Sequence, residues 1–164
     1  MSLPFELLSG DSKIWIYQSE RNFSAEEQKY ISAKLDQFLA NWASHGAAIV
    51  SGYTFKHQRF VIVAIDEATT NASGCSIDKL VHFMAQLGAE MGLNLMDRNI
   101  AFVKSENIES VNISQVKYLI TIGDINEQTH IFNNSITTKS ALSNNWLVKA
   151  SETWTSKYFK NQLV

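Results

Sequence analysis

The order of apolar periods along the chain constrains its fold most, because periods of two and of 3.6 residues require different secondary structures. The run KIWIYQ, residues 13–18, is rich in branched and aromatic residues and predicts a strand. A helix is expected from Ser24, which forms a capping box pattern with Glu27. Further along, the periods predict strands over 47–55 and 60–65, a helix over 76–92 and a strand over 98–104.

This order, βαββαβ, is typical of an α+β fold of the ferredoxin-like type, in which an antiparallel sheet carries two helices on one face. We expect residues 13–104 to form this core. Residues 105–164 are expected to form a C-terminal α/β extension packed on the core, within one domain of residues 1–164. His45 and Gly46 are expected to end the first helix through a glycine C-cap.

Within the extension, the pattern is looser but still divides into short elements. It favours a short helix over 113–124, short strands at 129–132 and 146–150, and a terminal helix over 151–159.

The predicted sheet needs cover on both faces, because its central runs are apolar throughout. Counting by two from Ile14 places Trp15 and Tyr17 on the face that points away from the helices. That face is expected to be covered either by a second subunit in a homodimer or by aromatic residues of the extension, namely Trp146, Trp154, Tyr158 and Phe159.

Composition narrows the class of protein. Apolar residues make up 45% and charged residues 18% of the chain, which is typical of a globular domain. A net charge of -2 offers no basic field, so nucleic acid is not an expected partner. One cysteine allows no internal disulfide, and no apolar run approaches the roughly 20 residues that cross a bilayer. We therefore expect a cytoplasmic protein that does not bind membranes.

The loop that leads into the second helix, residues 69–76, holds the first candidate site. Cys75 lies at the start of the helix, where free N–H groups and the helix dipole favour a charged thiolate. Lys79 and His82 fall on the same stripe, but seven residues separate Cys75 from His82 by about 10 Å along a helix. Asp66 and Glu67 end the preceding strand and are candidate proton carriers. The catalytic candidates are therefore Cys75, His82, Asp66 and Glu67.

A structural interpretation of the same loop competes with the catalytic one. Ser73 or Ser76 would cap the helix, Gly74 would permit a tight turn, and Cys75 would be a small residue that packs beside the sheet. On this view the loop, together with the polar segment 133–138, is a binding surface. Its candidate ligand-binding residues are Asn71, Ser73, Gly74, Ser76, Lys79, Asn133 and Asn134.

The four histidines show no H-x-H or H-E-x-x-H spacing, so no metal site is predicted. No G-x-S-x-G or G-x-G-x-x-G motif occurs either, and no cofactor is expected.

Three runs, IWIYQS, SGCSIDK with VHF after it, and HIFNN, resemble a family of short bacterial proteins that carry the automatic name ABC transporter ATPase. The likeness covers about Lys13 to Trp154. The family has no established mechanism, so the resemblance implies no catalytic residue.

The residues conflict with that family name. A phosphate-binding loop needs G-x-x-x-x-G-K-[ST], but the nearest run, ASGCSIDK, has one glycine and places Lys79 inside the helix. ATPase activity is therefore not expected.

Three hypotheses follow. The first is a non-enzymatic module that binds a partner or small molecule through the loop 69–76 and the segment 133–138. The second is a thiol-dependent enzyme with Cys75 as its nucleophile. The third is a structural homodimer that buries the face of Trp15 and Tyr17.

Overall fold

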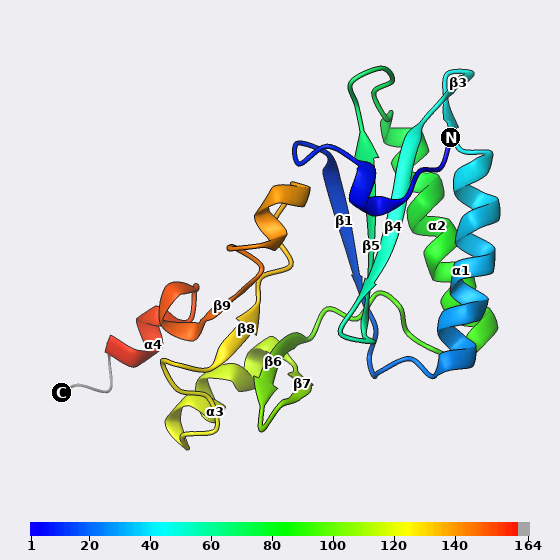
Figure 1. Ribbon diagram of the computed structural model, residues 1–164. Coiled ribbons are helices and arrows are strands. Elements are labelled where there is room, and N and C mark those ends of the chain that lie inside the picture. The colour runs from blue at the N-terminus through cyan, green and yellow to red at the C-terminus, as the bar shows by residue number, and fades with distance from the viewer. Residues whose placement is uncertain (161–164) are drawn as a thin grey trace. The chain divides into compact units, whose positions relative to one another are not determined.

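Figure 1 shows the computed structural model of the chain, which describes residues 1–160. The chain forms two compact units. Unit 1 consists of residues 1–97 and 137–140, and the rest of the described chain forms unit 2. Helices and antiparallel sheets occur together, which confirms the predicted α+β class. The single domain expected over 1–164 stays a prediction.

Unit 1 contains a three-stranded sheet in the order β1-β5-β4, with antiparallel neighbours. Its elements are η1 (Phe5–Leu7), β1 (Lys13–Gln18), α1 (Ala25–Ala40), β2 (Ala43–Ser44), β3 (Ala47–Ala48), β4 (Val50–Lys56), β5 (Phe60–Asp66) and α2 (Gly74–Met91).

The start of α1 is as predicted and its end is not. The Ser24 hydroxyl accepts from the Glu27 N–H at 3.1 Å, and the Glu27 carboxylate accepts from the Ser24 N–H at 2.9 Å. The helix ends at Ala40, however, so the predicted stop at His45 and Gly46 is wrong. These two residues have φ of 50° and 82° and form the turn of the β2–β3 hairpin. Positive φ at both positions is what a two-residue hairpin turn requires.

The helices cover the face of the sheet that the sequence analysis placed away from them. Tyr17 is buried in the core that α1 and α2 form, and Trp15 packs against that core. Trp15 lies opposite Val63 of β5, and Tyr17 lies opposite Val61. The predicted phase of β1 is therefore wrong, because β1 is apolar on both faces and period two does not say which face meets the helices. No second subunit is needed to cover this face.

The N-terminal segment, residues 1–12, lies against the opposite face (Figure 1). The Leu3 N–H donates to the Ser51 carbonyl at 2.8 Å, and the Ser51 N–H donates to the Met1 carbonyl at 3.0 Å. The chain then crosses Gly52, where a Cβ atom would collide with the Leu3 carbonyl oxygen. Lys139 holds the segment in place, because its ammonium donates to the carbonyl oxygens of residues 5, 6 and 8.

The fourth predicted strand belongs to another sheet. Strand β6 (Ile100–Lys104) pairs with β7 (Asn107–Val111) and with β8 (His130–Phe132) in unit 2, so its assignment to the 13–104 core is wrong. At the open edge of β1, where a ferredoxin-like fold has its fourth strand, the Ile14 N–H donates to the Thr137 carbonyl at 3.0 Å. Residues 105 and 106 have φ of 51° and 67°, which closes the β6–β7 hairpin locally.

Unit 2 contains a four-stranded sheet in the order β7-β6-β8-β9. The predicted short helix and the two short strands of the extension are confirmed, and the terminal helix is shorter than predicted. The remaining elements of unit 2 are η2 (Ile113–Gln115), α3 (Val116–Thr121), β9 (Leu147–Lys149), η4 (Ala150–Glu152) and α4 (Ser156–Lys160). The short helix η3 (Lys139–Leu142) starts within the residues of unit 1 and ends within those of unit 2.

Two aromatic residues that were expected to cover the first sheet lie in the packing of unit 2. Phe159 is buried with Phe102 and Ile131, and Trp146 meets the Phe132 ring edge-on at 5.0 Å between ring centres. In residues 1–160, no helix is both long enough and apolar enough to cross a membrane.

Candidate functional site

Two serines anchor the start of α2. Ser73 is the N-cap, and its hydroxyl accepts from the Ser76 N–H at 3.2 Å. The Ser76 hydroxyl donates to the Ala43 carbonyl at 3.2 Å, while the Ser73 N–H donates to the Ser44 hydroxyl at 3.2 Å. Of the two caps predicted, at Ser73 or at Ser76, the structure has the one at Ser73. Both serines serve the contact between α2 and the β2–β3 hairpin, and Ser76 is buried.

Cys75 is exposed in the first turn of α2, so its interpretation as a packing residue is wrong. One residue corresponds to about 100° of helix rotation, and Ser76 instead of Cys75 faces the hairpin. The tight turn predicted for Gly74 is also wrong, because Gly74 is the first helical residue and a Cβ there would meet nothing within 4 Å.

The rest of the predicted stripe lies on the exposed side of α2. Lys79 and His82 are both exposed, as Cys75 is. Among residues 1–160, none of the three makes a hydrogen bond or an ion pair with another side chain. The sequence pattern therefore predicts one face for these residues, but within residues 1–160 the structure brings no base to the thiol.

The two carboxylates ahead of the loop serve the end of β5. Asp66 accepts from the Ala68 N–H at 3.0 Å, as an Asx turn does. Glu67 forms an ion pair with Lys13 at 2.8 Å, and its side chain is 19% exposed. The structure thus gives both groups a local partner.

Asn133 and Asn134 lie in unit 2, whereas exposed Asn71 lies in unit 1. The Asn133 side chain accepts from the Ser135 N–H at 3.2 Å and from the Ser135 hydroxyl. Asn134 accepts from the indole N–H of Trp146 at 2.9 Å. The Asn133 amide therefore shapes the turn after β8, and the Asn134 amide holds Trp146.

A groove that the sequence analysis missed runs along β4, the edge strand of the first sheet. Its volume is about 570 Å³, and it is lined by residues 2–6, by Gln28, Ser32 and Asp36 of α1, and by residues 53–55 of β4. A second hollow of about 520 Å³, which extends to Phe23 and Gln58, shares Gln28 and Ser32 with it. We call the two together the β4 groove.

The polar centre of the β4 groove is the pair of Tyr53 and Asp36. The Tyr53 hydroxyl lies 2.8 Å from Asp36 Oδ1 and 3.2 Å from the Ser32 carbonyl oxygen, and it can donate to either. Burial, together with the Asp36 carboxylate, raises the pKa of Tyr53, so the hydroxyl remains protonated and a donor at neutral pH. Phe55 supplies an apolar surface beside this pair, with its ring edge-on to those of Phe23 and Tyr53.

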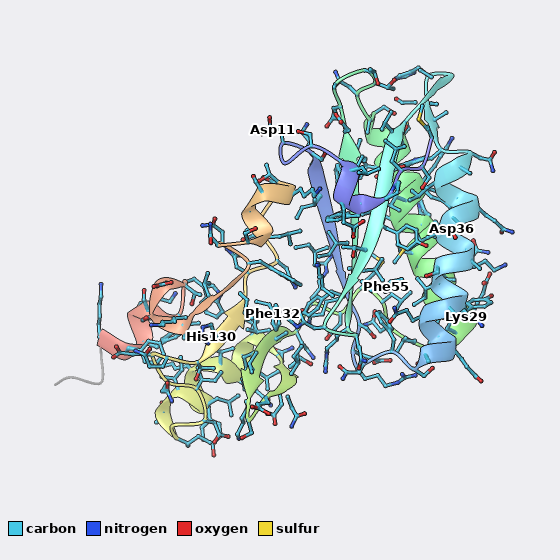
Figure 2. The ribbon with its side chains drawn as sticks, in the orientation of Figure 1. Asp11, Lys29, Asp36, Phe55, His130 and Phe132 are labelled. Atoms are coloured by element: carbon cyan, nitrogen blue, oxygen red, sulfur yellow. The ribbon has the colours of Figure 1, made fainter. Side chains whose placement is uncertain are left out.

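Figure 2 shows Asp36 and Lys29 on α1 and Phe55 on β4. Asp36 and Phe55 line the first hollow, and Lys29 lines the second. The sequence carried one signal for this site. Tyr53 and Phe55 alternate along a predicted strand, which indicates a strand with an aromatic face. No sequence pattern predicted the wall formed by residues 2–6, because apolar residues in this segment follow neither the helix nor the strand period.

In the part of the chain that the structure describes, no group of three or more histidine, cysteine, aspartate or glutamate residues is arranged to hold a metal ion. Comparison of the chain with protein-family models, with curated proteins and with solved structures finds no match.

Proposed function

We propose that the protein is a binding module, and that it holds a partner or a small molecule in the β4 groove. The observation that carries this proposal is the pairing of Tyr53 with Asp36 beside the apolar ring of Phe55. Binding sites commonly combine an apolar lining with a few converging polar groups in a space of about 300–1,000 Å³. Each of the two hollows has a volume within this range, and the first has this mixture.

This proposal moves the binding surface away from the loop 69–76 and the segment 133–138. Ser73 and Ser76 hydrogen-bond to the β2–β3 hairpin, and Asn133 and Asn134 hydrogen-bond within unit 2. A ligand would have to replace those bonds, at a net cost of about 1 kcal/mol each. In the groove the Tyr53 hydroxyl is bonded to Asp36 Oδ1, but within residues 1–160 the second carboxylate oxygen of Asp36 accepts no hydrogen bond, so a donor of the ligand can bind there without such an exchange.

A thiol-dependent enzyme is the second candidate, because Cys75 is exposed in the first turn of an 18-residue helix. A base would have to come from the substrate or from water, since the described part of the chain offers Cys75 no hydrogen-bonding base.

Chemical-shift mapping with a library of small polar and aromatic fragments tests the binding module. We expect fragment-induced shifts to concentrate on amides of β4 and of the first half of α1. Ser32→Phe, which fills the groove, should abolish them. Ala33→Phe is the matched control, because Ala33 is the next residue of α1, is exposed and does not line the groove.

Two results would contradict the proposal. One is a set of shifts concentrated around residues 69–76, which would return the site to the loop. The other is equal binding by Ser32→Phe and by Ala33→Phe.

A further inference from the structure

Only part of the outer edge of β4 forms backbone hydrogen bonds within residues 1–160. β5 pairs with its inner edge along all of its residues. On the outer edge, Ser51 exchanges backbone hydrogen bonds with Met1 and Leu3, which run parallel to β4. Backbone groups alternate in direction along a strand, so the N–H and C=O groups of Tyr53 and Phe55 point outward as those of Ser51 do. Within residues 1–160, no backbone group bonds to them on that side.

We propose that this edge, from Tyr53 to Phe55, accepts a short, cationic, extended segment of a partner protein, which adds to the sheet as a further strand. This inference rests on the proposed function of the β4 groove and names its occupant. The chain's own N-terminal residues provide the precedent, because Leu3 and Met1 already add to the same edge through Ser51. After Leu3 the chain leaves the edge and turns into η1, and the groove begins there.

The walls of the groove fit a strand and limit its length. Residues 4–6 form one wall, and Gln28, Ser32 and Asp36 of α1 form the other. At the far end, the Phe23 N–H donates to the Gln58 carbonyl at 2.6 Å and closes the edge. The open part spans about five residues, or roughly 17 Å at about 3.3 Å per residue. Side chains of an added strand would alternate between the two walls.

The edge itself also favours such an occupant. Tyr53, Thr54 and Phe55 carry no charge and no proline, which are the usual protections of an exposed strand against pairing. Strand addition supplies main-chain hydrogen bonds for affinity, while alternate side chains supply specificity.

The charges around the groove favour a cationic segment. Among the residues that line the two hollows, Glu6, Asp36 and Glu26 are acidic and Lys29 is basic. The nearby Lys139 ammonium is already bonded to the carbonyl oxygens of residues 5, 6 and 8. Within the described chain, neither Glu6 nor Asp36 takes part in an ion pair. A lysine or arginine at an alternate position of the added strand would reach one of these carboxylates.

The test uses the full chain and a capped heptapeptide of sequence Lys-Val-Thr-Val-Lys-Val-Thr as the probe. Amide hydrogen exchange is followed by NMR with and without the saturating peptide. We expect exchange at the Tyr53 and Phe55 amides to slow by about tenfold or more, because these N–H groups gain acceptors. A peptide with proline at every second position, which cannot donate at those positions, should bind at least about tenfold more weakly.

Two pairs of variants separate shape from charge. Ser32→Phe should abolish peptide binding, whereas Ala33→Phe should not change it. Asp36→Asn keeps an acceptor for the Tyr53 hydroxyl but removes the charge, and it should weaken binding by about threefold at low salt. Glu109→Gln, which removes one exposed carboxylate from β7 in unit 2, is the matched charge control.

Each other outcome overturns the strand proposal. If the peptide fails to bind while fragments still shift the groove amides, the binding module stands and the strand partner is wrong. The same holds if the peptide binds without protecting Tyr53 and Phe55. Protection that appears without peptide and grows with protein concentration would assign the edge to a second copy of the chain. Failure of both peptide and fragments would remove the proposed function as well.

Discussion

At the scale of single residues, two neighbouring positions in the first turn of α2 have different roles: one is buried and structural, and the other is exposed. Ser76 is buried against the β2–β3 hairpin, and Cys75, one residue before it, is exposed. The residue types do not distinguish the two, since serine and cysteine have similar size. The orientation of the helix relative to the hairpin decides which residue is buried, because it turns the Ser76 side chain inward and the Cys75 side chain outward.

Exposure of Cys75 leads to a prediction about its reactivity. Iodoacetamide should alkylate the native protein at a rate within about tenfold of that of the urea-unfolded chain at the same pH, because no packing shields the sulfur. Mass spectrometry of timed samples measures both rates. Cys75→Ser should take up no label and remain folded. Labelling that becomes fast only on unfolding would show that the thiol is buried after all.

The capping box of α1 leads to a prediction about pH. The hydrogen bond from Arg21 at 2.8 Å, followed by that from the Ser24 N–H, lowers the pKa of Glu27 from its ordinary value of 4.5 to about 2. A carboxylate with a lowered folded-state pKa stabilises the fold above the unfolded-state value, and this contribution disappears as the pH falls from about 4.5 toward 2.

Urea unfolding of Glu27→Gln tests this reasoning. At pH 7 the variant should be less stable than the parent chain by about 1 kcal/mol, the size of one exposed cap and ion pair. The difference should shrink as the pH is lowered from 4.5 to 3. A difference that stays constant over this range would show that Glu27 acts through something other than its charge.

At the scale of elements, the N-terminal segment completes the first sheet. It covers the face opposite the helices and pairs with part of the β4 edge. Both contacts pass through Gly52 and Ser51, which are neighbours on β4. Gly52 is needed because the backbone of Leu3 approaches too closely to leave room for a Cβ atom.

Gly52→Ala should therefore destabilise the protein by about 1–3 kcal/mol, as an overpacked site does, since a backbone carbonyl has to move. Gly74→Ala is the matched control. A Cβ at Gly74 meets open space in a helix, so this variant should be neutral or more stable by up to about 1 kcal/mol. Thermal unfolding of both variants provides the measurement. Equal stability of the two would mean that the Leu3 contact is not made.

At the scale of the whole molecule, the arrangement of α2 bears on nucleotide binding. Lys79 lies one turn inside the helix, and the Ser76 hydroxyl is engaged with the Ala43 carbonyl. A phosphate-binding loop needs a lysine at the mouth of the helix and a hydroxyl directed at magnesium. Neither requirement is met at this helix.

We predict that the purified protein neither binds ATP tightly nor hydrolyses it. Titration calorimetry with ATP and magnesium should give no saturable heat at micromolar concentrations, and phosphate release should match the protein-free rate. Magnesium-dependent binding in the micromolar range would contradict this prediction.

Local patterns in the sequence were enough to predict most helices and strands. The capping box at Ser24 and the apolar run of β5 each carry their signal within a few residues, because caps and strand propensities are local properties. The same reasoning placed Cys75, Lys79 and His82 on one stripe of α2, and the structure shows that this stripe is exposed. Strand β7 was missed, since Asn107–Val111 is half polar and lacks a clear alternation.

The tertiary structure alone decided which faces and edges meet. Trp15 and Tyr17 share a face in either phase of β1, and only packing against α1 and α2 selects the inward one. The sequence of β6 predicts a strand but does not determine which strands it pairs with. Its pairing with β7 and β8 depends on segments elsewhere in the chain. The β4 groove likewise exists only where residues 2–6 and α1 flank the same edge. Periodicity describes one segment at a time, whereas a core or a site forms between segments that are distant in sequence.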